Sequence, residues 1–314
     1  MKTCYVVVVN YKRWEDTVAC LRSLFGSQYP AIKALVVDNL SGNQSLEQIA
    51  GQLRAAPLEW PAVQGQADFT LTTAESLSGL DFRQLPDLLL VQNNRNAGFA
   101  AGNNLVLQYL QHLDGYVFLL NPDMTLHPAA LQALSGATLQ WPNAVFGLQT
   151  RSFDQPDQVL FYGGGTIRYA TATVKMQETP TDGSQLDYIS GGALFLDATT
   201  LKAVGLLPED YFLYWEETDW CQQAIRKGYT LAVCPEAICY DKVSTVIGRG
   251  FLSDYYYTRN GLLFLRKYAK GSLPTALLGT FLRAGKRLLA GRGDRAKGMW
   301  RGVVDFLTGK DNGH

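Results

Sequence analysis

Short unbroken runs of apolar residues recur along the first part of the chain, and polar residues follow each of them. The runs cover residues 5–9, 34–37, 88–91 and 116–120. Four or five apolar residues without alternation are typical of a strand buried on both faces, as in a parallel sheet. Apolar positions at helical spacing lie between the runs, at residues 17–25, 45–53 and 105–113. This alternation predicts an α/β fold with a mostly parallel central sheet and helices on both faces.

The pattern becomes less regular in two regions. Residues 55–86 contain prolines, glycines and little periodicity, and we expect an excursion loop or a small β-flap there. After a helical pattern at 128–139, short strands and glycine-rich turns follow over 144–174. The remaining expected elements are a strand with an internal glycine pair at 188–196, a helix at 216–227, short strands at 231–233 and 237–240, and an aromatic-rich helix at 254–268.

The composition narrows the class of protein without naming a function. The 314 residues are 47% hydrophobic with zero net charge, which is typical of a globular protein and gives no sign of a nucleic-acid partner. The five cysteines are odd in number and lack a C-x-x-C spacing, which favours buried thiols in a reducing compartment. The chain begins without a signal peptide and has no membrane-spanning run, so we expect a cytoplasmic protein.

Positive charge concentrates in the last part of the chain, residues 271–314. Two helical patterns flank the sequence Gly291-Arg292-Gly293. Apolar residues can gather on one side of the first helix, with Arg283, Lys286 and Arg287 toward the other; they are Leu277, Leu278, Phe281, Leu282, Leu288 and Leu289. Such a helix predicts peripheral contact with the anionic inner face of the cell membrane. The alternative is a basic amphipathic helix packed on the protein itself.

Carboxylates follow two of the buried runs. Asp38 comes directly after the run at 34–37, and Asp123 ends the sequence Asn121-Pro122-Asp123 after the run at 116–120. Ligands of open α/β sheets bind at the carboxyl ends of the strands. Asp123 therefore suits a hard cation that carries phosphates, although the same residues also make a good turn. Asp38 can accept the ring N–H of a pyrimidine or, alternatively, cap a helix.

A third group of acids, Glu216, Glu217 and Asp219, opens the helix expected at 216–227. The helix dipole favours acids at this end without any function. However, Trp215 and Trp220 flank them, and aromatic faces beside carboxylates are typical of sugar-binding sites. The polar, glycine-containing loop at 93–104 also opens a helix and can cradle a ribose or a phosphate. It lacks the dinucleotide fingerprint and the Walker lysine.

Six short motifs occur in one order, at residues 6–11, 36–41, 96–104, 121–123, 190–193 and 212–221. Together they resemble the family 2 glycosyltransferases, in particular the rhamnosyltransferase-like branch. The resemblance covers residues 3–270 apart from the insertion at 55–86. It implies a GT-A fold in residues 1–270, with a nucleotide-sugar half at 1–125 and an acceptor half at 126–270, followed by the helical tail at 271–314.

The reaction implied by the resemblance is inverting transfer of a sugar from a dTDP or UDP donor, most simply dTDP-rhamnose. The acceptor would be a hydroxyl of a glycan or a lipid-linked molecule in cell-wall polysaccharide synthesis. Glu217 would be the catalytic base, with Glu216 and Asp219 beside it, and Asp123 and Asp241 would hold Mg²⁺ or Mn²⁺. Acceptor contacts would come from Tyr214, Trp215 and Trp220. Donor contacts would come from Asn10, Tyr11, Asp38, Asn39, Asn96, Gly98, Asn103, Asn121, Gly191, Gly192 and Arg259.

One position departs from the family pattern. Many relatives carry a histidine where this chain has Asp241, which can still ligate a hard cation. Lys242, Arg249 and Arg259 are cations that could offset the diphosphate charge instead. Two other functions stay open: a nucleotidyltransferase, which the lack of glycine at 10–14 disfavours, and a non-catalytic nucleotide-sugar binding module, which Asn121 and Asp241 favour.

Overall fold

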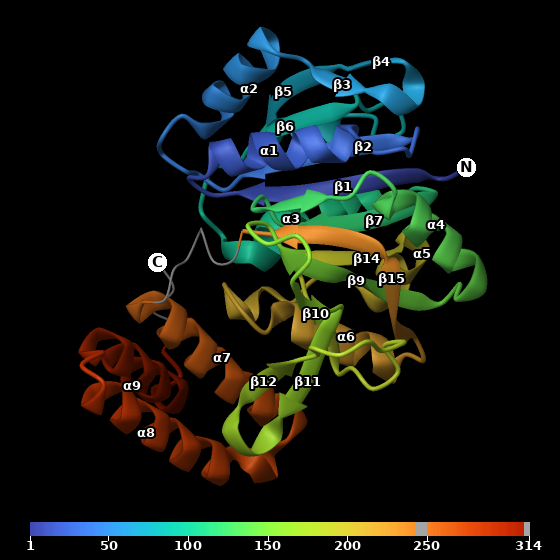
Figure 1. Ribbon diagram of the computed structural model, residues 1–314. Coiled ribbons are helices and arrows are strands. Elements are labelled where there is room, and N and C mark those ends of the chain that lie inside the picture. Colours follow the sequence, from blue (N-terminus) through green and yellow to red (C-terminus); the bar gives the residue numbers. More distant parts are fainter. Residues whose placement is uncertain (243–249, 311–314) are drawn as a thin grey trace.

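A mixed sheet forms the centre of the protein in the computed structural model, which describes residues 1–242 and 250–310 (Figure 1). Within these residues the sheet has ten strands, in the order β5-β6-β2-β1-β7-β14-β9-β15-β8 with β10 beside β9. The parallel half consists of β5 (Phe69–Thr73), β6 (Leu88–Gln92), β2 (Ile32–Asp38), β1 (Thr3–Asn10) and β7 (Gly115–Leu120). The other half consists of β14 (Ala193–Asp197), β9 (Ala144–Ser152), β10 (Val159–Tyr162), β15 (Thr230–Asp241) and β8 (Met124–Leu126).

Helices cover both faces of this sheet. On one face lie α1 (Trp14–Phe25), α2 (Ser45–Ala55) and α4 (Ala130–Gln140), and on the other lie α3 (Gly98–Leu110), α5 (Ala198–Val204) and α6 (Glu216–Arg226). Each face of the sheet has its own hydrophobic core: the first under α1, α2 and α4, and the second under α3, α5 and α6. Because side chains alternate along a strand, Val6 and Val8 of β1 pack into the first core while Val7 packs into the second. Both faces are buried, which explains the unbroken apolar runs and confirms the predicted layering.

Three expected elements have different boundaries. The strand expected at 188–196 is interrupted: β13 (Tyr188–Ile189) joins β11 (Gly164–Arg168) and β12 (Thr173–Met176) in a small sheet, whereas β14 lies in the central sheet. The glycine pair forms the turn between them. The two strands expected at 231–240 are the single strand β15, whose register shifts between Cys234 and Ile238. In the insertion, β3 (Leu58–Trp60) and β4 (Gly65–Ala67) form a hairpin, and β5 extends the central sheet.

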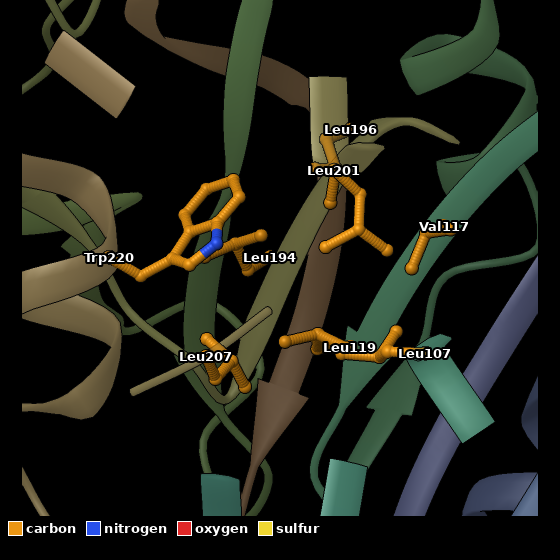
Figure 2. A pocket seen from close by; sticks show the side chains of 8 residues that line it. All are labelled: Leu107, Val117, Leu119, Leu194, Leu196, Leu201, Leu207 and Trp220. Atoms are coloured by element: carbon orange, nitrogen blue, oxygen red, sulfur yellow. The ribbon is translucent and has the colours of Figure 1, made fainter. Parts of the chain in front are cut away.

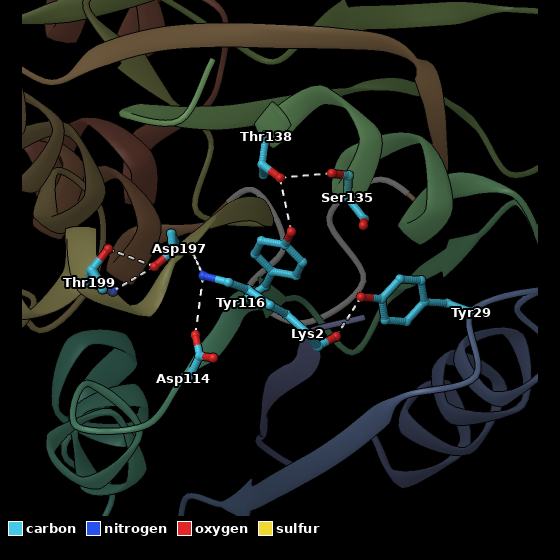
Figure 3. A network of polar contacts seen from close by, with 8 residues as sticks. All are labelled: Lys2, Tyr29, Asp114, Tyr116, Ser135, Thr138, Asp197 and Thr199. Carbon is cyan, nitrogen blue, oxygen red and sulfur yellow. Dashed lines mark hydrogen bonds and ion pairs between the residues drawn. The ribbon is translucent and has the colours of Figure 1, made fainter. Parts of the chain in front are cut away.

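A polar network ties the strands together at the end of the sheet where β1 and β7 begin (Figure 3). The ammonium group of Lys2 lies 2.7 Å from Asp197 and 3.2 Å from Asp114. The hydrogen bond to Asp197 is the main reason why the pKa of Lys2 is raised. Tyr29 donates its hydroxyl to the carbonyl oxygen of Lys2 at 2.5 Å. This network leaves the opposite end, where the parallel strands finish, for a ligand.

All five cysteines are buried and free, as the sequence predicts. Burial raises the pKa of Cys234 to about 11 and that of Cys221 to about 12. These thiols therefore stay protonated at neutral pH and serve as packing groups.

The last three helices form a separate layer at the end of the molecule opposite α2 (Figure 1). They are α7 (Phe251–Tyr268), α8 (Leu273–Leu289) and α9 (Gly293–Thr308), and they share a third core with Tyr211 and Trp215. Asp254 of α7 is buried and forms ion pairs with Arg287 of α8 and Arg295 of α9. None of the helices among the described residues is both long and apolar enough to cross a membrane.

We expect Asp254→Asn to destabilise this layer. Removing one carboxylate leaves two partly buried guanidinium groups without a counter-charge, which should cost about 3 kcal/mol of unfolding free energy. The matched control is Asp294→Asn, since Asp294 is exposed and lies 3.6 Å from the exposed Lys297. Urea denaturation measures both. Equal small losses in the two variants would contradict the structural role of Asp254.

Candidate functional site

Five segments that are far apart in the sequence meet near the carboxyl ends of β2 and β7. The side-chain amide of Asn39, after β2, donates to the carbonyl oxygen of Gly98 at 3.0 Å. The next amide N–H, of Phe99, donates to the carbonyl oxygen of Phe212 at 2.8 Å. Asn121, after β7, donates its backbone N–H to Gly192 at 2.8 Å. The motifs singled out in the sequence are therefore brought together.

The tightest of these contacts is between Gly98 and Phe212. Its φ is +81°, and a Cβ placed there would lie 2.2 Å from the carbonyl oxygen of Phe212. Both the conformation and the space require glycine at this position. The start of α3 is thereby held against the segment that leads into α6.

The glycine pair at 191–192 lies between the two groups of acids. A Cβ at Gly191 would lie 3.3 Å from the Cβ of Glu217, and a Cβ at Gly192 would lie 3.3 Å from the amide nitrogen of Asn121. Adjacent backbone positions thus contact the first turn of α6 and the Asn121-Pro122-Asp123 motif. This turn therefore lies between the acids of α6 and the motif that contains Asp123.

The segment before α6 has an unusual backbone. Phe212, Tyr214 and Trp215 all have positive φ, at 26°, 66° and 79°. Each such non-glycine residue costs about 1–3 kcal/mol, and such strain concentrates at functional sites. Asn260 of α7 holds the segment, because its side-chain amide donates to the carbonyl oxygens of Leu213 at 2.7 Å and Tyr214 at 3.3 Å. Asn260 was not among the residues predicted from the sequence, where it is one of several polar residues in an aromatic-rich helix.

Asp219 is a structural residue. It is fully buried, and it accepts hydrogen bonds from Lys267 at 2.7 and 2.8 Å and from the hydroxyls of Tyr211 at 2.8 Å and Tyr268 at 2.5 Å. Gln223 donates a further one. Both oxygens are thus engaged with the protein, and Asp219 fastens α6 to α7. The geometry therefore corrects the prediction that it belongs to the catalytic group.

Glu217 differs from the acids on either side, because it is partly exposed while Glu216 and Asp219 are buried. Desolvation raises the pKa of Glu217 to about 7, against the lowering effect of the backbone N–H groups of Glu217 and Thr218. Burial raises the pKa of Glu216 well above its usual range, with the charge of Glu217 as the second cause. Within the described part of the chain, Oε2 of Glu216 has no hydrogen-bond partner. Glu217 is therefore the acid of α6 best placed to exchange a proton near neutral pH.

Neither tryptophan can contact an acceptor in this structure. Trp220 points into a small apolar cavity of about 10 Å³ that is lined by leucines and Val117 (Figure 2). Its indole N–H donates to the carbonyl oxygen of Gly205 at 2.7 Å. Trp215 is buried in the third core and donates to Tyr257 at 3.1 Å. The acceptor roles predicted for both are wrong, since their side chains form the cores beneath α6. Tyr214 is partly exposed, with its hydroxyl 3.2 Å from that of Ser253.

The polar residues after β1 and β2 bind chiefly one another. Asp38 accepts hydrogen bonds from Asn10 at 2.6 Å, from the hydroxyl of Ser41 at 2.5 Å and its N–H at 3.0 Å, and from Gln92 at 3.1 Å. A carboxylate has about four lone-pair positions, so a pyrimidine N–H would have to displace one of these donors. Asn10 is also fully buried. This network argues against a direct contact between Asn10 and a nucleotide base. Asp38 could bind a base only if one of its present hydrogen-bond donors were displaced.

Other predicted donor contacts divide between buried and accessible residues. Asn39 and Asn103 are buried; Asn103 donates to the carbonyl oxygen of Phe99 at 2.9 Å. Asn103 thus belongs to the helix rather than to a ligand surface, contrary to the prediction. Tyr11 and Asn96 are partly exposed, and their contacts with a nucleotide stay predictions. The ammonium group of Lys12 lies 4.9 Å from the centre of the Tyr11 ring.

Asp123 and Asp241 come close through strand pairing. β15 pairs with β8 so that Asp241 lies opposite Met124, the residue after Asp123, and the N–H of Lys242 donates to the carbonyl oxygen of Asp123 at 3.2 Å. Lys242 also pairs with Asp16 at 2.6 Å. Among the residues that the structure describes, there is no group of three or more acidic, histidine or cysteine side chains arranged to hold a metal ion.

The three cations considered as substitutes for a metal have different positions. Lys242 lies beside Asp123 but is paired with Asp16, as above. Arg259 is buried and donates to the side-chain oxygen of Asn260 at 2.9 Å. Arg249 lies outside the described residues. The contact of Arg259 with a diphosphate stays a prediction.

Comparison with known proteins identifies the fold. No family model matches the chain. A curated relative, the low-salt glycan biosynthesis hexosyltransferase Agl10 of Haloferax volcanii, is 23% identical over 183 residues, which are 55% of this chain. The match spans 58% of that relative's length.

Solved structures extend the similarity over nearly the whole chain. The mannosyltransferase PcManGT of Pyrobaculum calidifontis, in complex with GDP-Man and Mn²⁺, is 15% identical with a TM-score of 0.59 over 99% of this chain and 88% of that one. S. aureus TarS 1–349, in complex with UDP-GlcNAc, is 14% identical with a TM-score of 0.54 over 98% and 81%. The chain therefore has the GT-A fold, with additional C-terminal helices, as the resemblance implied.

Titration of Glu217 should make stability depend on pH. The pKa of Glu217 in the folded protein, about 7, lies above the ordinary value of 4.5. Its contribution to the free energy of unfolding is therefore fully present below pH 4.5 and is lost as the pH rises through 7. Glu217→Gln should remove this loss, so the variant should gain unfolding free energy relative to wild type between pH 5 and 8. Urea denaturation across this range measures it. The control is Glu47→Gln on the exposed surface of α2, which should keep the wild-type profile; the same profile for Glu217→Gln would rule out the raised pKa.

Proposed function

We propose that the protein is an inverting glycosyltransferase that moves a sugar from a nucleoside diphosphate to a hydroxyl group. The observation that carries this proposal is the turn at Gly191-Gly192. One glycine contacts Glu217, a partly exposed acid with a pKa of about 7, and the next contacts Asn121 of the Asn121-Pro122-Asp123 motif. A group that can accept a proton and a group that can hold a diphosphate thus lie on two sides of one backbone turn.

The proton transfer follows from the chemistry of Glu217. A sugar hydroxyl is a weak nucleophile until a base takes its proton. In the proposed step, Glu217 accepts the proton of the acceptor hydroxyl. At the same time the oxygen of that hydroxyl bonds to the anomeric carbon of the donor sugar. The bond from that carbon to the diphosphate breaks with its electron pair, and the nucleoside diphosphate leaves. Attack opposite to the leaving group inverts the anomeric configuration.

The leaving diphosphate needs positive charge beside it. Asp123 and Asp241, with the amide oxygen of Asn121, offer hard oxygen ligands on neighbouring segments, since Asp241 pairs opposite Met124. Mg²⁺ is commonly held by one or two carboxylates together with substrate phosphates, so this small donor set fits Mg²⁺ or Mn²⁺ without a third protein acid. The cation would offset charge on the leaving group. The similar mannosyltransferase PcManGT was solved with Mn²⁺, which supports this assignment.

The donor we propose is a pyrimidine-diphosphate sugar, dTDP-rhamnose or a UDP sugar. The order of motifs resembles the rhamnosyltransferase-like branch, and TarS was solved with UDP-GlcNAc. PcManGT was solved with GDP-Man, so purine donors belong in the same screen. Thermal shift against a panel of nucleotide sugars, with and without Mn²⁺, identifies the donor. The acceptor we propose is a hydroxyl of a glycan or of a lipid-linked molecule in cell-wall polysaccharide synthesis, and Agl10, named for glycan biosynthesis, supports this class.

Glu217→Gln should reduce turnover by about 10²–10⁴-fold and leave affinity for the nucleotide sugar nearly unchanged. The substitution keeps the size of the side chain and removes its basicity. Release of nucleoside diphosphate in the presence of acceptor measures turnover, and calorimetry measures donor affinity. Wild-type activity should rise with pH around 7, because only the charged carboxylate accepts a proton. Glu47→Gln is the control, and full activity in Glu217→Gln would exclude Glu217 as the base.

Asp123→Ala should abolish turnover and the Mn²⁺-dependent part of nucleotide binding without unfolding the protein. Asp123 lies in the turn between β7 and β8, outside both strands, so the fold should survive. Titration of UDP with and without Mn²⁺ tests this, with exposed Asp157→Ala as the control. An unchanged response to Mn²⁺ would contradict the metal role of Asp123. Nucleotide binding by wild type without any release of diphosphate would instead favour a non-catalytic binding module.

A further inference from the structure

A stripe of exposed apolar side chains runs along α8. It consists of Leu278, Phe281, Leu282, Leu288 and Leu289, with exposed fractions of 61%, 42%, 61%, 59% and 92%. The spacing of three, four and seven residues places them on one side of the helix. α9 adds Trp300, which is 55% exposed and whose ring centre lies 5.5 Å from that of Phe281. We call these six residues the apolar stripe.

The opposite side of α8 packs on the protein. Ala276 and Thr280 are buried. Arg283 donates to the carbonyl oxygen of Thr171 at 2.8 Å, and Arg287 pairs with Asp254. The sequence pattern predicts Arg283 and Arg287 on a basic surface opposite the apolar residues. The structure shows that they bind the protein there, so the basic surface must come from other residues.

Exposed cations flank the apolar stripe. Lys286 on α8, Arg292 between the helices, and Lys297 and Arg301 on α9 are all exposed, although Lys297 lies 3.6 Å from Asp294 and Arg301 lies 3.0 Å from Asp305. Of the two acids in the described parts of α8 and α9, Asp305 is buried and Asp294 is exposed. The stripe with its cationic margin therefore carries net positive charge.

We propose that the apolar stripe docks on an anionic phospholipid surface, with α8 lying in the plane of the membrane. An amphipathic helix with leucine and aromatic side chains on one face and basic residues at its margin binds such surfaces. Tryptophan favours the boundary between headgroups and acyl chains, where Trp300 would lie. The 17 residues of α8 span about 25 Å, which suits a helix lying in the interface. The cationic margin favours anionic lipid over a second copy of the same positively charged face.

The position of the stripe bears on the acceptor. α8 and α9 pack on α7, and α7 holds the segment 212–215 through Asn260. Docking would therefore anchor the acid-bearing turn of α6 to a membrane, where a lipid-linked acceptor is found. This last step rests on the proposed function, whereas the docking itself does not.

Flotation with phospholipid vesicles tests the docking without donor or acceptor. We expect wild type to float with vesicles of phosphatidylcholine and phosphatidylglycerol at 3:1, and at least tenfold less with phosphatidylcholine alone. In 0.5 M salt binding should weaken, because charges are screened within a few ångströms. The double variant Leu282→Glu, Leu289→Glu should lose binding at least tenfold. Leu139→Glu is the matched control, since Leu139 is 84% exposed on α4, away from the stripe.

Each alternative outcome overturns the proposal. Wild type that fails to float with the anionic vesicles, or a double variant that floats as well as wild type, would do so. Equal binding of wild type to neutral and anionic vesicles would contradict the proposed preference for anionic lipid, and with it the role of the cations. If light scattering shows that wild type is a dimer and the double variant a monomer, the stripe is an interface between copies. Release of nucleoside diphosphate in solution is measured separately, so loss of docking is distinguishable from failure of the proposed function.

Discussion

The site depends on close packing at three glycines. At Gly98 the carbonyl oxygen of Phe212 occupies the space of a Cβ, and at Gly191 and Gly192 the neighbours are Glu217 and Asn121. A larger residue at Gly98 would push the start of α3 away from the segment before α6, and at Gly191 or Gly192 the neighbouring side chains would have to shift. Because of these contacts, strand ends from the parallel half of the sheet and a helix from the other half meet in one place. The geometry of the proposed reaction follows from this packing.

The second requirement is a rigid support for a strained segment. Three residues between 212 and 215 have positive φ, and their cost is offset by hydrogen bonds from Asn260 and by the burial of Trp215. Asp219 adds an ion pair to Lys267, which ties the same helix to α7. These groups hold Glu217 partly desolvated, and desolvation is the reason for its raised pKa. The C-terminal helices thus contribute to the site through α7, which carries Asn260 and Lys267.

Much of the fold could be predicted from the sequence because burial on both faces of a parallel sheet leaves unbroken apolar runs. The sequence also placed Asp123, Gly98, Gly191 and Glu217 in one region. These residues follow strand ends or lie in glycine-containing turns, and such positions are decided by the path of the backbone. The environments of individual polar side chains could not be predicted. Trp220 and Asp219 have the residue types of a sugar site, yet one fills a core and the other fastens two helices. Asn260 was missed because its partners are carbonyl oxygens 47 residues away in the chain.

The most direct test of the account is the crystal structure of the protein with Mn²⁺ and the donor nucleotide that the thermal-shift screen selects. The account predicts an anomalous manganese peak within about 2.5 Å of the carboxylate of Asp123 and in contact with the diphosphate. It also predicts that the open face of the anomeric position is directed toward Glu217. A nucleotide bound away from the carboxyl ends of β1, β2 and β7, or manganese with no contact to Asp123, would contradict it.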